Sequence, residues 1–142
     1  MATKEVNEKH LEFIENVIDR MGRNSFQCKT WCFSVITALM VYLFSQPDND
    51  VLRLRVLLTS LTVIGAFFLL DTYYFHLEKG YRELYSMVAG LKGKGDIVRN
   101  YDMNVPDSAK GCLNYLKAMK SPATGMSYGL LSIIIVCAYF LL

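Results

Sequence analysis

The chain has 142 residues, 53% of them of hydrophobic types, and a formal net charge of +2 at pH 7. This length suits one folded unit rather than two, and so small a charge gives no support to direct binding of nucleic acid. Three stretches, 30–47, 56–70 and 121–142, contain no charged residue. A helix of about 20 apolar residues crosses the hydrocarbon of a bilayer. The sequence therefore predicts an all-α integral membrane protein with three transmembrane helices in a single unit, 1–142.

The N-terminal segment is amphipathic and runs without a break into the first apolar stretch. Val6, Phe13, Val17 and Met21 recur at helical spacing, which is typical of a helix with one apolar face. No proline or turn cluster separates these residues from the first span. We therefore expect one helix over 4–46, whose first half projects beyond the membrane.

The second span is expected to return beside the first. The run from Gln46 to Asp50, Gln-Pro-Asp-Asn-Asp, is a turn signal too short to hold a domain, so the two spans should form an antiparallel hairpin. The second helix, predicted over 51–90, also continues past the membrane until the glycine-rich stretch that begins at Gly90. Its projecting half carries an apolar and aromatic stripe that should pack on the first helix: Tyr74, Leu77, Tyr81, Leu84, Tyr85 and Val88.

Residues 91–120 are predicted to form a loop followed by a short helix. Pro106-Asp107-Ser108 is a good helix start, which favours a helix from about 107 to 119. Ser121-Pro122 then breaks the chain before the third span, 121–142. This span, mainly Ile, Leu and small residues, is typical of a packing or anchoring helix. Its Gly125 and Gly129 have the spacing that lets membrane helices approach closely.

The distribution of basic residues predicts the orientation. Five Lys and Arg residues precede position 30 and eight lie in 79–120, whereas only Arg53 and Arg55 lie beside the predicted turn. Basic residues concentrate on the cytoplasmic side of membrane proteins. We therefore expect the N-terminus and the 78–120 segment in the cytoplasm, and the turn and the C-terminus outside.

Asp71 is an acidic residue inside the second apolar run. A carboxylate at the bilayer centre costs about 2.5 kcal/mol or more, which leaves two interpretations. Asp71 lines or gates a pore, or it lies at the membrane interface and pairs with Lys29 or Arg82. Antiparallel pairing of the helices brings further polar residues to the same depth, where they form a network that fixes the hairpin register or acts as a switch: Arg20, Asn24, Ser25, Lys29, Glu78 and Arg82.

No set of residues predicts catalysis, a cofactor or a metal site. The two histidines, His10 and His76, belong to different helices. Cys28 and Cys32 share a helix face but supply only two of the four ligands of a structural zinc site, so they are predicted to be structural thiols. The Gly-Leu-Lys-Gly-Lys-Gly run at 90–95 follows no strand and indicates a basic link rather than a phosphate loop. We therefore expect that the protein is not an enzyme and needs no cofactor.

Two runs resemble small bacterial membrane proteins found with anti-phage systems. One run, 10–31, begins His-Leu-Glu-Phe-Ile-Glu-Asn-Val-Ile-Asp-Arg; the other, 70–85, begins Leu-Asp-Thr-Tyr-Tyr-Phe-His-Leu-Glu. The chain looks similar here to SLATT-like two-span effectors and to the pore-forming accessory protein of type VI-B CRISPR systems. The resemblance, which covers roughly 8–90, implies an effector that oligomerises and permeabilises the inner membrane during infection. The family-like positions it implies are Arg20, Asn24, Ser25, Asp71, Tyr74, Glu78 and Arg82.

Three functional hypotheses follow from these features. The first is a homo-oligomeric effector that permeabilises or depolarises the bacterial inner membrane, with the lipid bilayer and a companion defence protein as further partners. The second is a non-catalytic regulatory or scaffold subunit of a membrane complex, docking through Tyr81, Leu84 and Tyr85. The third is a ligand-gated element that senses a nucleotide or a partner through the basic residues Lys92, Lys94, Arg99 and Lys110. The third span departs from a plain two-span pattern.

Overall fold

The computed structural model describes residues 2–45, 50–91, 102–107, 109 and 111–141. The regular structure in these residues is entirely helical, in four helices: α1 (Ala2–Phe44), α2 (Asp50–Val88), α3 (Cys112–Met119) and α4 (Pro122–Leu141). Of these, α1, α2 and α4 are each long and apolar enough to cross a membrane. The prediction of an all-helical chain with three candidate spans is thus confirmed. The predicted turn at 46–49 lies outside the described residues.

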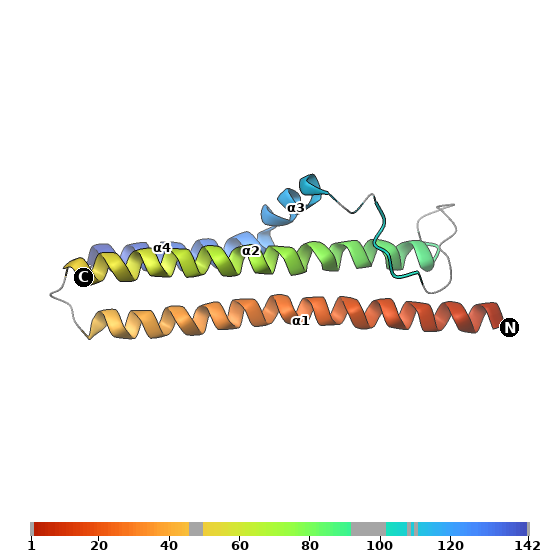
Figure 1. The fold of residues 1–142 in the computed structure, drawn as a ribbon, viewed down its shortest axis with the longest axis horizontal. Coiled ribbons are helices and arrows are strands. Elements are labelled where there is room, and N and C mark those ends of the chain that lie inside the picture. Colours follow the sequence, from red (N-terminus) through yellow and green to blue (C-terminus); the bar gives the residue numbers. More distant parts are fainter. Residues whose placement is uncertain (1, 46–49, 92–101, 108, 110, 142) are drawn as a thin grey trace.

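The two long helices lie antiparallel over almost their whole length, and α4 runs beside one half of α2 (Figure 1). The end of α4 lies near the start of α2, whereas the start of α1 lies at the opposite end of the molecule (Figure 1). At 1.5 Å per residue α1 is about 64 Å long and α4 about 30 Å. A bilayer that α4 just crosses would therefore enclose about half of the α1–α2 pair.

The core lies where the three long helices meet. Its buried members are contributed by α1, α2 and α4: Cys32, Ile36, Ile64, Tyr128, Leu131 and Ile135. The outward surfaces of the same helices carry large apolar side chains, among them Trp31, Val41, Leu58, Ile133 and Phe140. So extensive an exposed apolar surface marks a membrane or protein contact. It is compatible with a membrane location for the three helices.

Two contacts between α1 and α2, spaced seven residues apart on each helix, define the register of the hairpin. A Cβ atom built on Gly22 would lie 3.8 Å from Oε2 of Glu78, and Lys29 contacts Asp71. Lys29 is seven residues after Gly22, and Asp71 is seven residues before Glu78, so both contacts fall on one face of each helix. The two helices therefore stay in the same register from the amphipathic half into the apolar half.

The end of α2 depends on a glycine. The Leu91 N–H donates to the Ser86 carbonyl at 3.0 Å, and the Gly90 N–H donates to the Met87 carbonyl at 3.1 Å. Gly90 has a φ of 70°. This is the Schellman arrangement, in which a left-handed residue, usually glycine, closes the last helical turn.

The segment 102–107 packs against the amphipathic halves of α1 and α2. A Cβ atom on Gly80 would lie 2.6 Å from Cγ1 of Val105, so the segment approaches α2 closely because residue 80 has no side chain. On the α1 side, Nε2 of His10 lies 3.1 Å from the carbonyl oxygen of Asp102, and His10 is buried. The irregular segment is thus held from both long helices.

The short helix is shorter than the predicted 107–119. The Ala109 N–H donates to the Pro106 carbonyl at 2.9 Å, so Pro106 and Asp107 belong to a turn, and Ser108 lies outside the described residues. Gly111, at φ 121°, interrupts helical geometry, and α3 begins at Cys112 without a side-chain cap. The prediction of a helix start at 107 or 108 was wrong because its turn residues are not followed by a continuous run of helical backbone.

Candidate functional site

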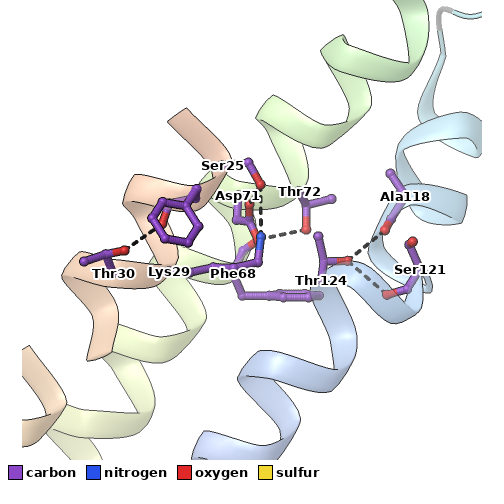
Figure 2. Close-up of polar contacts among 10 residues, drawn as sticks. Ser25, Lys29, Thr30, Phe68, Asp71, Thr72, Ala118, Ser121 and Thr124 are labelled. Carbon is purple, nitrogen blue, oxygen red and sulfur yellow. Dashed lines mark hydrogen bonds and ion pairs between the residues drawn. The ribbon is translucent and has the colours of Figure 1, made fainter. Parts of the chain in front are cut away.

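Asp71 lies at the centre of a polar cluster between α1 and α2 (Figure 2). Its Oδ2 atom lies 2.7 Å from Nζ of Lys29, and the Ser25 hydroxyl donates to its Oδ1 atom. Lys29 Nζ also donates to Ser25 Oγ at 3.0 Å. Ser25 and Lys29 lie four residues apart and so share one face of α1. The three side chains form a closed set in which each contacts the other two.

The cluster is buried on the carboxylate side and open on the lysine side. Asp71 is 0% exposed, whereas 22% of the Lys29 side chain is exposed. A charge removed from water needs a charged partner and hydrogen bonds. Lys29 supplies the opposite charge for Asp71, and Ser25 supplies a hydrogen bond to Oδ1. The long stem of a lysine can lie along apolar surface while its ammonium reaches a polar region. The structure therefore pairs Asp71 with Lys29, one of the two partners that the sequence suggested.

Arg82, the other suggested partner, pairs elsewhere. Its Nη2 atom lies 2.6 Å from Oε1 of Glu78, one turn away on α2. Glu78 is buried against α1 at Gly22. The predicted polar positions thus form two separate groups, one at Asp71 and one at Glu78.

The remaining predicted positions take no part in these two groups. Asn24 and Tyr74 line a recess of about 280 Å³ on the surface of the hairpin, together with Cys28 and Trp31. Arg20 is exposed on α1. Of the seven predicted positions, the structure therefore joins Ser25 to Asp71 and Glu78 to Arg82, and leaves three outside both contacts.

The third long helix contributes residues that the sequence did not single out. The ring of Tyr128 packs edge-on against Phe68 with 5.7 Å between centroids, and the phenol lies within electrostatic reach of Asp71, Cys28 and Cys32. The Thr124 hydroxyl donates to the carbonyls of Ala118 and Ser121 at 3.0 and 3.2 Å (Figure 2). The sequence did not predict these contacts of Tyr128 and Thr124, because a lone tyrosine or threonine in an apolar span forms no periodic pattern.

A row of hydroxyl side chains lies on the exposed surface of α1. We call Thr30, Ser34 and Thr37 the hydroxyl row. Each hydroxyl donates to the carbonyl four residues earlier, at 3.1, 3.0 and 2.8 Å. All three residues are exposed, and with Lys29 they line an open hollow of about 590 Å³ whose other lining residues are Phe26 and Phe33. The hydroxyl row is thus a polar strip along an apolar helix.

Within the described residues, no three His, Cys, Asp or Glu side chains are grouped to hold a metal ion. Cys28 and Cys32 are buried free thiols on α1. Comparison with protein-family models, with curated proteins and with solved structures finds no match for this chain.

Proposed function

We propose that the chain is a homo-oligomeric membrane effector that permeabilises the bacterial inner membrane, acting in anti-phage defence as its resemblance to such effectors implies. The observation that carries the permeabilising activity is the hydroxyl row, Thr30, Ser34 and Thr37, on the exposed surface of α1. The uneven distribution of Lys and Arg supports a cytoplasmic N-terminus and an external C-terminus. A companion defence protein is a further expected partner.

The hydroxyl row suits a surface that meets water inside the membrane. Its three residues, spaced by four and three positions, follow one helix face for about 10 Å. Their hydrogens are used by backbone carbonyls, and each oxygen keeps acceptor capacity for water. An aqueous path requires several copies, because the space between the three long helices of one copy is filled by the apolar core. In the proposed oligomer the α1 helices turn their hydroxyl rows toward a common centre.

The Asp71 cluster has a positioning role in this proposal. Asp71 has no exposed surface in the single chain, so it does not itself contribute to the proposed pore wall. Lys29 joins the two features, since it pairs with Asp71 and lines the hollow of the hydroxyl row. The ion pair thereby fixes the rotation of α1 about its axis, which decides the direction in which the hydroxyl row faces.

The three residues that the scaffold hypothesis proposes for docking a partner are largely buried within the chain. Leu84 is 2% exposed, and Tyr81 and Tyr85 are partly buried. The ligand-gated hypothesis depends on Lys92, Lys94, Arg99 and Lys110, which lie outside the described residues. The burial of Tyr81, Leu84 and Tyr85 favours the permeabilising effector over the scaffold hypothesis, and the described residues do not bear on the ligand-gated hypothesis.

The test replaces the hydroxyls without changing the shape of the helix. Purified chain carrying Thr30→Val, Ser34→Ala and Thr37→Val together is reconstituted in vesicles that contain a self-quenched dye, and oligomer size is measured in detergent. Thr62→Val is the matched control, because the Thr62 hydroxyl is also exposed and donates to the carbonyl four residues earlier, at 2.8 Å, but lies on α2.

We expect the unaltered chain and the control to release the dye, and the triple variant to keep its oligomer size but release little dye. Dye release by the triple variant at the normal rate would refute the role of the hydroxyl row. A protein that stays monomeric and leaves the vesicles intact would refute the effector. In cells, dye-reported loss of membrane potential on phage infection tests the defence context separately.

A further inference from the structure

A small cavity lies between α2 and α3. It has a volume of about 180 Å³, and six of its lining residues are His76, Lys79, Gly80, Glu83, Asn114 and Lys117. Two lysines from different helices therefore converge on one cavity, with an imidazole and an amide beside them. Nζ of Lys79 lies 4.4 Å from the ring centroid of Phe75, a cation–π contact that restrains the ammonium.

The helix that forms one wall of this cavity is amphipathic. Leu113 and Leu116 of α3 are 75% and 46% exposed, whereas Ala118 is fully buried. Tyr115 fixes α3 to α2, because its hydroxyl donates to the Leu69 carbonyl at 3.1 Å and its ring contacts that of His76. The two leucines thus remain uncovered by the described part of the chain.

The place of α3 in the chain puts it at a membrane surface. It ends at Met119, and the candidate span α4 begins at Pro122. Lys117 and Lys120 flank this junction and are exposed. A short amphipathic helix with exposed leucines and adjacent lysines is typical of segments that lie in the plane of the interface, with their apolar side in the acyl boundary.

We propose that the α2–α3 cavity binds the phosphate of an anionic phospholipid headgroup, while Leu113 and Leu116 contact the acyl chains of the same leaflet. Lys79 and Lys117 supply the positive charge, and His76 and Asn114 supply further polar groups. The volume lies below the range of about 300–1,000 Å³ that is usual for drug-sized ligands, which suits a headgroup rather than a whole nucleotide. A phospholipid also covers the exposed leucines, which a soluble anion would leave in water.

Glu83 provides an internal test of the charge argument. It is an acidic residue among those that line the cavity, so its carboxylate opposes binding of an anion. Removing this charge should strengthen phospholipid binding, whereas removing the lysines should weaken it. The proposal depends on the membrane location of the chain and not on its permeabilising activity.

The experiment measures phospholipid bound to the delipidated full-length chain in detergent by native mass spectrometry. Phosphatidylglycerol, phosphatidylcholine and inorganic phosphate are compared for the unaltered chain, the double variant Lys79→Gln/Lys117→Gln, Glu83→Gln and the control Arg55→Gln. Arg55 is exposed near the start of α2, at the other end of the candidate span. Binding is measured without vesicles, so its outcome is independent of dye release.

We expect phosphatidylglycerol to bind in preference to phosphatidylcholine. Because a basic residue near an anionic membrane surface contributes about fivefold in affinity, the double variant Lys79→Gln/Lys117→Gln should weaken phosphatidylglycerol binding by about 25-fold. Glu83→Gln should strengthen it, and Arg55→Gln should leave it unchanged. Equal binding of the two phospholipids, an equal loss in Arg55→Gln, or displacement of the lipid by inorganic phosphate at equal concentration would overturn the proposal.

Discussion

Lys29 Nζ of α1 and Asp71 Oδ2 of α2 lie 2.7 Å apart, and Asp71 has no exposed surface. Ser25 completes the contact through its own hydroxyl, which donates to the other carboxylate oxygen. This pair joins the two long helices beside the core to which α4 contributes Tyr128. Because the carboxylate is enclosed and the ammonium is not, the two partners should respond differently to substitution.

Asp71→Asn should destabilise the chain and keep its helical content. Removal of one partner from a buried pair costs roughly 3–5 kcal/mol, and the partial exposure of Lys29 places the loss at the lower end of that range. Thermal unfolding followed by circular dichroism in detergent measures the effect. The double variant Asp71→Leu/Lys29→Met should recover much of the loss, since neither charge is then left unpaired. Asp50→Asn, which breaks the Asp50–Arg53 pair on its exposed carboxylate side, is the control. A loss in the double variant equal to the sum of the losses in Asp71→Leu and Lys29→Met would contradict a coupled pair.

Gly80→Ala should loosen the 102–107 segment. The new methyl group would lie 2.6 Å from Cγ1 of Val105, and overpacking of this kind typically costs about 1–3 kcal/mol, which outweighs the gain of about 1 kcal/mol from better helix propensity. Faster amide hydrogen exchange over 102–107 reports the displacement. Gly65→Ala is the control, because a Cβ atom there meets nothing within 4 Å. Adding Val105→Ala to Gly80→Ala should restore protection, and its failure to do so would argue against the contact.

His10→Phe should release the same segment from the α1 side. Phenylalanine keeps an apolar ring in the buried position but loses the nitrogen that lies 3.1 Å from the Asp102 carbonyl oxygen. A buried carbonyl without its donor costs roughly 1–3 kcal/mol, and the partial exposure of Asp102 places the loss at the lower end of that range. Hydrogen exchange of 102–107 should therefore increase, while Lys9→Gln, an exposed neighbour, leaves it unchanged. Equal protection in both variants would show that this hydrogen bond does not hold the segment.

Thr124→Val should weaken the corner between α3 and α4. The fully buried Thr124 hydroxyl donates to the carbonyls of Ala118 and Ser121, so its removal should lower the unfolding free energy by about 1–2 kcal/mol. Ser132→Ala removes a hydroxyl that bonds within α4 itself, to the Tyr128 carbonyl, and serves as control. Chemical denaturation in detergent compares the two. A larger loss in Ser132→Ala than in Thr124→Val would place the stabilising contact elsewhere.

The sequence predicted the helices better than their lateral contacts. Charge-free runs and helical spacing identified the three candidate spans, because hydrophobic length is read directly from residue order. The same pattern narrowed the partner of Asp71 to Lys29 or Arg82. It could not choose between them, because the choice depends on the exact register of two helices whose amphipathic stripes are each several residues wide. In the structure, the register of α1 on α2 is defined by two contacts, Gly22 with Glu78 and Lys29 with Asp71.

Contacts that depend on irregular backbone were beyond pattern analysis. The fit of Val105 against Gly80 and the cavity that joins Lys79 to Lys117 bring together residues separated by tens of positions. No period relates such residues. The predicted helix start at 107 or 108 was wrong for a local reason, since Gly111, at φ 121°, departs from helical geometry, and the turn residues before it do not reveal this.

The repeated register of the hairpin has a mechanical consequence. The contacts at Gly22–Glu78 and Lys29–Asp71 lie two helical turns apart, about 10 Å along the axis. If α1 slid along α2, both contacts would be lost together, and Ile14, Cys32 and Ile36 would leave their enclosed sites at the same time. The two helices therefore resist sliding along each other and move as one rigid body. A force applied to its amphipathic end reaches the apolar end as tilt or rotation of both helices together rather than as slippage between them.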